Sequence, residues 1–118
     1  MNYVELAREN DFFRRTLVTG KHAQVVVMTI QPGEDIGEET HEGDQILFFV
    51  EGEGEAVLEG ESEPVGPNDM VFVPAGTLHN FLNTGSQPLR LVTTYAPPEH
   101  PDGTVHRTKA EADAAEDH

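Results

Sequence analysis

The sequence predicts an all-β fold, and three observations support this class. Its apolar runs are short and rich in valine, phenylalanine and threonine, which favour strands. The 11 Gly and 8 Pro are spread between those runs, as turns between short strands require. The 118 residues are enough for one domain with a single core. Together these observations predict about eight short strands in a β-sandwich or barrel.

The first half of the chain supplies the first of these strands. After a polar segment that ends near Arg15, "AQVVVMTI" (residues 23–30) predicts a buried strand, and the "QPGEDIG" that follows predicts a turn. In "QILFFVEGEGEAVLEG" (residues 45–60), two runs of branched and aromatic residues flank Gly52 to Gly54. This pattern predicts a hairpin with its corner at the glycines.

The second half continues the strand pattern after one interruption. "ESEPVGPND" (residues 61–69) breaks the pattern, and "MVFVPAG" (residues 70–76) resumes it. "TLHNFLNTGSQPLRLVTTYA" (residues 77–96) predicts two more strands around a turn at 83–88. The expected barrel therefore spans about residues 16–96.

The end of the chain changes character and has little to bury. Three prolines and a glycine follow closely in residues 97–107, which predicts an ordered strap. Thr108 is followed three residues later by Glu111, a capping-box spacing that predicts a short alanine-rich helix over 108–118. We see no internal repeat or low-complexity linker, so we expect residues 1–118 to form a single domain.

Charge and composition exclude several partners. The formal charge of −15 repels nucleic acid and anionic membranes, and no apolar run approaches the ~18 residues of a membrane span. The absence of cysteine removes thiolate chemistry and fits a reducing compartment, so we expect a cytoplasmic protein. Only Lys21 and Lys109 are lysines, which leaves a salt-rich cytoplasm as an alternative to an ordinary acidic protein.

Four polar residues are placed to converge inside the barrel. Residues at even separations in a strand share a face, so Glu39, His41 and Gln45 could point the same way. His79 begins a second same-face set on a later strand. If these two strands are neighbours, the four side chains meet in the interior. An isolated histidine is usually a surface residue or a hydrogen-bonded core residue, so we expect a shared site only if these two strands are neighbours.

The spacing of these residues resembles the two motifs of the cupin family. Those motifs run glycine, five residues, His-x-His, three or four residues, glutamate, six residues, glycine; and then glycine, five, proline, x, glycine, two, histidine, three, asparagine. This chain has the matching positions Gly33, Glu39, His41, Gln45 and Gly52, and then Asn68, Pro74, Gly76, His79 and Asn83. The resemblance implies a cupin double-stranded β-helix, a jelly-roll barrel, with a short C-terminal helix.

The resemblance also implies a metal site with substituted ligands. Glu39 stands where the family has a histidine, and Gln45 stands where it has a glutamate. Exchanging an imidazole for a carboxylate and a carboxylate for an amide leaves the charge of the shell at about minus one. We therefore expect one divalent ion, Mn, Fe, Ni, Zn or Co, bound by His41, His79, Gln45 and Glu39. An amide oxygen is a weaker ligand than a carboxylate, which predicts reduced affinity.

Nearly the whole chain is similar to a group of small stand-alone cupins named after mannose-6-phosphate isomerase. The similarity lies in "TGKHAQVVVMTIQPGEDIG", "DQILFFVEGEG" and "PAGTLHNFLNTGSQPLRLVTTYAPPEHPDGTVHRTKAEA". A sugar phosphate suits this chain poorly, because phosphate needs clustered donors and only Arg90 is expected in a strand that could line the pocket. The group name is therefore a label and predicts no substrate.

Two further features extend outward from the barrel. His100 and His106 lie in the strap, either as groups of a lid over the pocket or as residues bonded to the backbone. If Gln45 faces inward, then Ile46, Phe48 and Val50 face the other way and need a second cover. We expect a homodimer packed sheet to sheet, with the amino-terminal segment or the tail as the alternative cover.

Two classes of function fit these expectations. A metal-dependent enzyme acting on a small molecule, as an isomerase, dioxygenase or decarboxylase, fits the implied metal site. A non-catalytic barrel that binds or senses a small-molecule ligand fits the altered ligand set. The sequence leaves both open, because this barrel hosts many unrelated functions.

Overall fold

The computed structural model describes residues 1–116, and within them it has nine strands and two helices. The elements are α1 (Tyr3–Glu9), β1 (Arg14–Thr19), β2 (Gln24–Ile30), β3 (Asp44–Glu51), β4 (Gly54–Leu58), β5 (Glu61–Val65), β6 (Met70–Val73), β7 (His79–Asn83), β8 (Leu89–Ala96), β9 (Val105–His106) and α2 (Lys109–Glu116). The predicted all-β class with a short C-terminal helix is confirmed.

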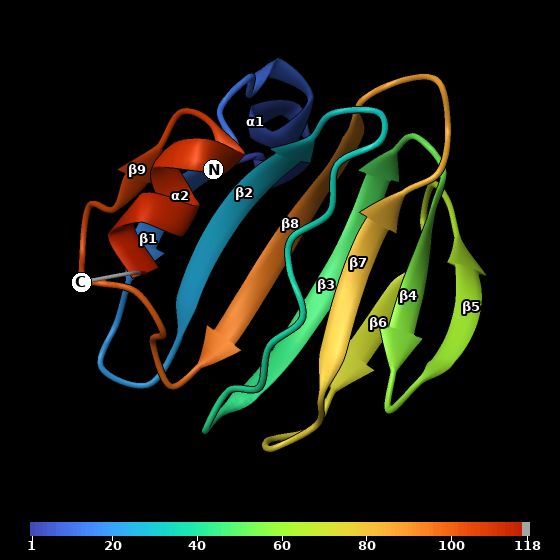
Figure 1. The fold of residues 1–118 in the computed structure, drawn as a ribbon. Coiled ribbons are helices and arrows are strands. Elements are labelled where there is room, and N and C mark those ends of the chain that lie inside the picture. The colour runs from blue at the N-terminus through green and yellow to red at the C-terminus, as the bar shows by residue number, and fades with distance from the viewer. Residues whose placement is uncertain (117–118) are drawn as a thin grey trace.

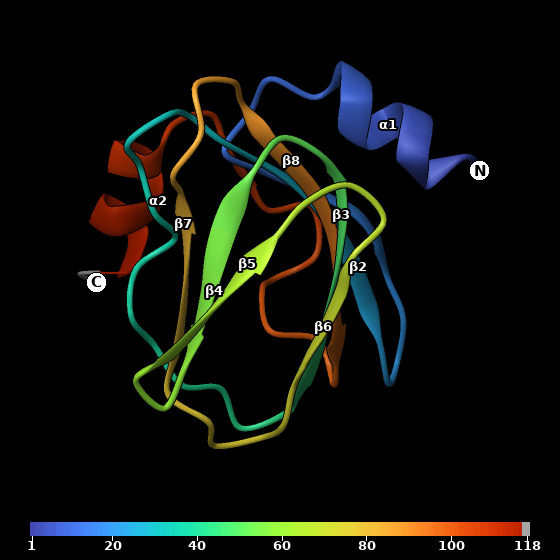
Figure 2. The same cartoon turned by 90° about the vertical axis from the view of Figure 1, so that its right-hand side faces the viewer.

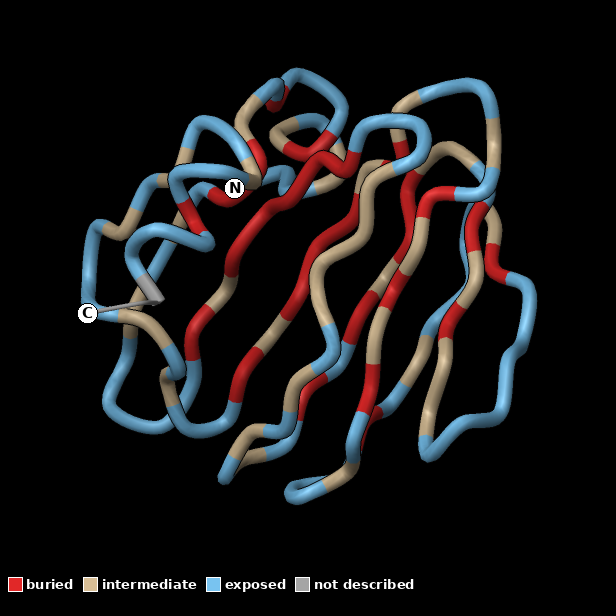
Figure 3. Tube along the Cα trace, in the orientation of Figure 1, coloured by how far each residue is buried: buried red, intermediate tan, exposed pale blue. Residues whose placement is uncertain are grey.

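The strands form two antiparallel sheets that face each other. The larger sheet has six strands in the order β6-β3-β8-β2-β1-β9, and the smaller has three in the order β5-β4-β7 (Figures 1 and 2). The main core lies between them, where Leu47 and Phe49 of the larger sheet pack with Phe81 of the smaller. Buried residues follow the strands of both sheets, and the turns between them are largely exposed (Figure 3).

The segment 31–43 lies along β7, as Figure 1 shows, and extends the smaller sheet. The Ile36 amide donates to the Phe81 carbonyl at 3.0 Å. Farther along, Glu39 and His79 exchange two backbone hydrogen bonds, each 3.0 Å long. This segment therefore acts as an irregular strand that fixes Glu39 opposite His79.

The prediction of a hairpin across Gly52–Gly54 is wrong. β3 pairs with β6 and β8, whereas β4 pairs with β5 and β7, so the corner carries the chain from one sheet to the other. Gly52 has φ +93, and a Cβ there would lie 2.5 Å from the Pro88 carbonyl oxygen. The glycine pattern marks a tight corner between sheets, which is locally similar to the turn of a hairpin.

The interruption expected at residues 61–69 contains the strand β5 (Glu61–Val65). β5 is an edge strand that pairs only with β4, and its first four residues are exposed. Pro64 is tolerated there because an edge strand has one side that needs no hydrogen-bond donor. The proline and the polar composition concealed this strand in the sequence.

The helix α1 was not predicted, although its cap is visible in the sequence. The Asn2 side chain accepts a hydrogen bond from the Glu5 amide at 3.1 Å, which is a capping interaction. Ala7 of this helix joins Val27, Val50 and Val92 in a second apolar cluster on the outer face of the larger sheet. The amino-terminal segment, named above as the alternative cover, thus covers part of that face, and Figure 2 shows α1 outside the sheet.

The carboxyl-terminal segment is a strap that closes on the barrel. β9 pairs with β1, and the Thr108 hydroxyl caps α2 by accepting from the Glu111 amide at 3.1 Å. Ala112 of α2 packs into the main core. The expected helix is therefore confirmed from Lys109 to Glu116, and its predicted extension over 117–118 lies outside the described residues. Across residues 1–116, no helix is both long and apolar enough to cross a membrane.

Gly52 provides a test of the corner between the sheets. We expect Gly52→Ala to lower the free energy of unfolding by about 2–4 kcal/mol, because the methyl group would add a clash with Pro88 to the cost of a positive φ. Gly33→Ala is the matched control, since Gly33 has φ +83 and nothing within 4 Å of a Cβ. It should cost about 1 kcal/mol. Equal losses in urea denaturation would contradict this account of the corner.

Candidate metal centre

Backbone pairing places Glu39 and His79 side by side. They are directly opposite each other in the antiparallel contact between segment 31–43 and β7, so their side chains leave the backbone on the same face. The Glu39 Oε1 atom lies 4.0 Å from the His79 Nε2 atom. The predicted proximity of these two residues is thus a consequence of strand pairing.

His79 is buried and oriented by its own turn. Its Nδ1 atom lies 2.8 Å from the Thr77 carbonyl oxygen, so Nδ1–H donates there and Nε2 carries the free lone pair. Nε2 is buried and has no hydrogen-bond partner among the described residues. Metal-binding histidines are commonly held in this way, with one nitrogen anchored and the other free.

His41 completes the group from the other side of Glu39. Its Nε2 atom lies 3.2 Å from Glu39 Oε1, and its Nδ1 atom lies 3.1 Å from Glu99 Oε1. Both contacts are within ion-pair distance, but neither nitrogen has hydrogen-bond geometry to a described residue. The ring is tilted against that of His79, with 5.0 Å between their centroids.

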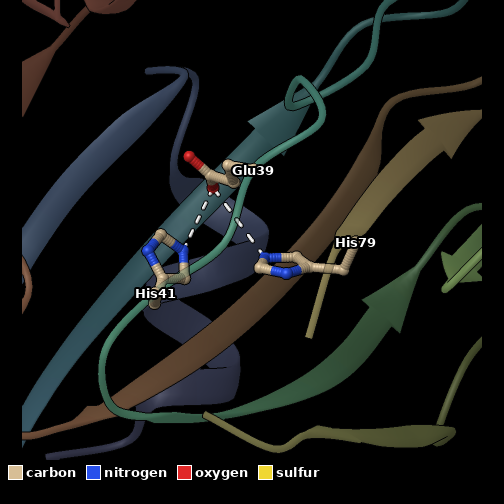
Figure 4. Close-up of side chains that lie close together, drawn as sticks. All are labelled: Glu39, His41 and His79. Atoms are coloured by element: carbon tan, nitrogen blue, oxygen red, sulfur yellow. Dashed lines mark ion pairs between the residues drawn. The ribbon is translucent and has the colours of Figure 1, made fainter. Parts of the chain in front are cut away.

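These three side chains point toward one another (Figure 4). One ligand atom from each of Glu39, His41 and His79 lies within 4.8 Å of the others. Ligand atoms on a shared ion, each bonded at about 2.0–2.2 Å, are separated by about 3–4 Å, so a small inward movement would suit a divalent cation. Two imidazoles and a carboxylate are also a donor set that such ions accept.

Gln45 lies on β3, on the same inward face as Leu47 and Phe49. It is buried, and its amide nitrogen donates to the Thr93 hydroxyl at 3.0 Å. Its Oε1 atom is buried without a hydrogen-bond partner among residues 1–116. An orphaned carbonyl oxygen of this kind suits a weak ligand, and the role of Gln45 as a fourth ligand stays a prediction.

The charges of the site stabilise each other. Burial would raise the pKa of Glu39, but the neighbouring His41 holds it below its usual value. Burial would lower the pKa of His41, but the carboxylates of Glu39 and Glu99 outweigh this and raise it. Burial also raises the pKa of Tyr95, whose ring edge contacts His41, so its phenol keeps its proton.

Two residues near the site were not found from the sequence. Glu99 reaches His41 because the strap folds back over the barrel, and the side chain of the fully buried Gln24 fixes the strap. The Gln24 Oε1 atom accepts from the amides of Glu99 and His100 at 3.2 and 3.0 Å. The glutamine in the otherwise apolar strand "AQVVVMTI" is the one signal in the sequence that could have indicated a polar partner beside this strand.

Arg14 is the second residue near the site that the sequence did not reveal. Arg90 lies in a strand, β8, as expected, but its guanidinium is not available to the pocket, because it bonds to the Asn10 carbonyl and pairs with Glu51 beside α1. Arg14 of β1 is instead the buried arginine, because β9 and the strap cover it. The alternation of side chains between the two faces of β1 would have predicted a buried Arg14 only if the first residue of that strand had been known.

A β-barrel that gathers two imidazoles and a carboxylate in its interior defines a candidate metal-binding barrel. The chain belongs to the cupin family, whose cupin-domain model matches residues 26–95. The predicted family is therefore confirmed.

Particular relatives agree with this assignment. The uncharacterized protein YrkC of Bacillus subtilis is 47% identical over 125 residues, which cover 99% of this chain and 67% of that protein. The crystal structure of BH2720 from Bacillus halodurans has a TM-score of 0.95 at 46% identity, covering 97% of this chain and 92% of that one. An acireductone dioxygenase of Parvibaculum lavamentivorans is 32% identical over 88 residues, 64% of this chain and 47% of that enzyme.

The raised pKa of His41 predicts that protons compete with a bound ion. His41 must be neutral to bind metal, so Mn²⁺ affinity should fall as the pH drops through this raised pKa, by about tenfold per pH unit below it. Glu99→Gln removes one carboxylate that raises the pKa, so its affinity should begin to fall at a lower pH. Calorimetric titrations between pH 8 and 5 would measure both curves. Affinity that is independent of pH in this range would contradict the role of His41.

Proposed function

We propose that this cupin binds one divalent metal ion through Glu39, His41 and His79, with Gln45 as a fourth ligand, and acts on a small molecule as a metal-dependent dioxygenase. The observation that carries the proposal is the buried Nε2 atom of His79, which has no described hydrogen-bond partner and lies 4.0 Å from Glu39 Oε1. An orphaned nitrogen beside a carboxylate is costly unless a cation or a proton is shared between them.

The donor set favours the dioxygenase among the candidate enzyme classes. Two histidines and one carboxylate are the facial set of non-haem iron(II) oxygenases, which leaves positions open for substrate and dioxygen. The similarity to an acireductone dioxygenase supports the same class, although it covers less than half of that enzyme. When bound, such an ion supplies a Lewis acid that holds substrate oxygens and a centre that activates dioxygen.

The chain's own residues would position the reactants. Thr77 fixes the ring of His79, and Glu99 contacts the outer nitrogen of His41, so both imidazoles have restricted orientations. Tyr95 keeps its phenolic proton next to His41 and could donate it to a substrate oxygen. The apolar side chains of Leu47, Phe49 and Phe81 exclude water from the deep side of the site.

Elemental analysis of untagged protein tests the metal site. We expect near-stoichiometric metal in the wild type and its loss in the His41→Ala, His79→Ala double variant, because both free imidazoles are removed. His22→Ala is the matched control, since His22 is exposed on a turn outside the barrel. Gln45→Leu should keep the site but weaken Mn²⁺ binding by about tenfold. Equal metal content in all variants would contradict the proposal.

A second assay tests the reaction class. Dioxygen uptake by the Fe²⁺-loaded protein should be measured with hydroxy acids, dicarbonyls and catechols, and His79→Ala should abolish any turnover. A compound that stabilises the loaded protein against heat without being consumed would instead support the non-catalytic binding barrel.

We also propose a homodimer through the part of the larger sheet that α1 leaves uncovered. Ile46, Met70 and Phe72 are 46%, 61% and 45% exposed, and they line an apolar pocket of about 370 Å³ on the outer face. Such a contiguous apolar face at a sheet edge is typical of a protein interface. Light scattering should show a dimer that Phe72→Glu converts to a monomer. Val18→Glu, at an exposed valine on β1, should leave the dimer intact, and a monomeric wild type would contradict the proposal.

A further inference from the structure

Arg14 is a buried cation without a direct carboxylate partner among the described residues, although its charge helps to lower the pKa of Glu39. It begins β1, is 2% exposed, and forms no ion pair with a carboxylate of the residues that the structure describes. Its Nε atom is buried and has no hydrogen-bond partner there either. Guanidinium stays protonated at any physiological pH, so burying it without an anion is costly. The arrangement indicates a binding site for an anion.

The strap supplies the one described hydrogen-bond partner of this guanidinium, which also lies over the Phe13 ring at 5.3 Å. Arg14 and His106 are paired between β1 and β9, and the Arg14 Nη1 atom lies 2.8 Å from the His106 Nδ1 atom. Because arginine can only donate, His106 accepts on Nδ1 and its ring is neutral. Burial and the charge of Arg14 also lower the pKa of His106. His106 therefore orients the guanidinium without neutralising it.

His100 adds a second neutral imidazole to the same place. Gln24 holds its backbone by donating to the His100 carbonyl at 2.8 Å and accepting from the His100 amide. The Nε2 atom of His100 is buried and has no described partner. Burial and, after it, the charge of Arg14 lower the pKa of His100 to about 4, so the ring is neutral at pH 7.

These residues surround a pocket that is large enough for a small ligand. Its volume is about 240 Å³, and it is lined by Arg14, His100, Pro101, Thr104, His106 and Ala115. These lining side chains include one permanent cation and no acid, in a chain whose formal charge is −15. A local positive charge on such an acidic protein attracts an anion to this position.

The pocket adjoins the candidate metal centre. The ring of His100 contacts the edge of Tyr95, with 5.3 Å between centroids, and Tyr95 contacts His41 at 5.6 Å. His41 in turn lies 5.0 Å from His79. A molecule anchored at Arg14 could therefore extend along Tyr95 toward the metal ligands.

We propose that Arg14, positioned by His106 and flanked by His100, binds the carboxylate of a small organic acid that is the substrate of the neighbouring centre. A guanidinium fork matches the two oxygens of a carboxylate and balances its single charge. A phosphate dianion suits the pocket less well, since it needs several clustered cationic donors. This inference rests on the proposed function, because it assigns the substrate class of the same site.

The test compares small acids with their uncharged amides. Pyruvate, lactate and benzoate, and the corresponding amides, should be titrated into wild-type protein, with and without Mn²⁺, by calorimetry and by NMR of the Arg14 Nε–H signal. We expect at least one acid to bind about tenfold or more tightly than its amide and to shift that signal. Acids and amides that bind equally, or do not bind, would overturn the inference. Inorganic phosphate that binds more tightly than every acid would overturn the carboxylate assignment.

Variants locate the binding. Arg14→Gln should remove the preference for the acid, and Arg14→Lys should retain only part of it, because lysine keeps the charge but loses the fork. Arg15→Gln is the matched control, since Arg15 is the exposed neighbour on β1. An equal loss in Arg14→Gln and Arg15→Gln would overturn the assignment to Arg14. If Arg14→Gln does not fold, the acid and amide titrations of the wild type still decide.

The two proposals fail in different ways. If the protein binds no metal even when Mn²⁺ is added, but still binds acids through Arg14, the proposed function is contradicted and the anion site is supported. One Mn²⁺ bound through His41 and His79 without a preference for acids would contradict the anion site and leave the proposed function standing.

Discussion

The two backbone hydrogen bonds between Glu39 and His79 are the interaction on which the site depends. Segment 31–43 pairs with β7 through separate bridges and not through a continuous ladder, and these bonds, each 3.0 Å long, fix Glu39 directly opposite His79. The pairing places a carboxylate opposite an imidazole on the inward face, and His41, two residues farther on, reaches the same carboxylate. Without this pairing, the acid would be one more solvated group on a very acidic surface.

Burial then gives these residues their chemistry. A carboxylate and two imidazoles inside a barrel cannot all remain without partners, so they share protons or a cation. The strap increases this constraint, because Glu99 contacts His41 and His100 lies over Tyr95. The same strap brings His106 to Arg14 and buries this cation without a direct ion pair to a described carboxylate. The strap therefore contributes to both the candidate metal centre and the pocket beside Arg14.

Local patterns in the sequence predicted most of the barrel, because alternation and turn residues describe each strand by itself. They predicted His41 and His79 from motif spacing, and the structure places both beside Glu39. They did not predict which strands pair, so the corner at Gly52 was taken for a hairpin.

Long-range cover was the other feature that local patterns missed. Glu99 reaches the site on the folded-back strap, which also covers Arg14 of β1 and is held by the buried Gln24. Likewise, α1 covers Val50 on the outer face of the larger sheet, although the helix and this valine lie far apart in the sequence. A contact between distant segments leaves no periodic trace in the sequence of either one.

The most direct test of the metal centre is anomalous diffraction from crystals grown with Mn²⁺. The account predicts one strong anomalous peak within bonding distance, about 2.0–2.3 Å, of Glu39 Oε1, His41 Nε2 and His79 Nε2. A crystal that holds Mn²⁺ at other positions, with no peak between these three side chains, would contradict it.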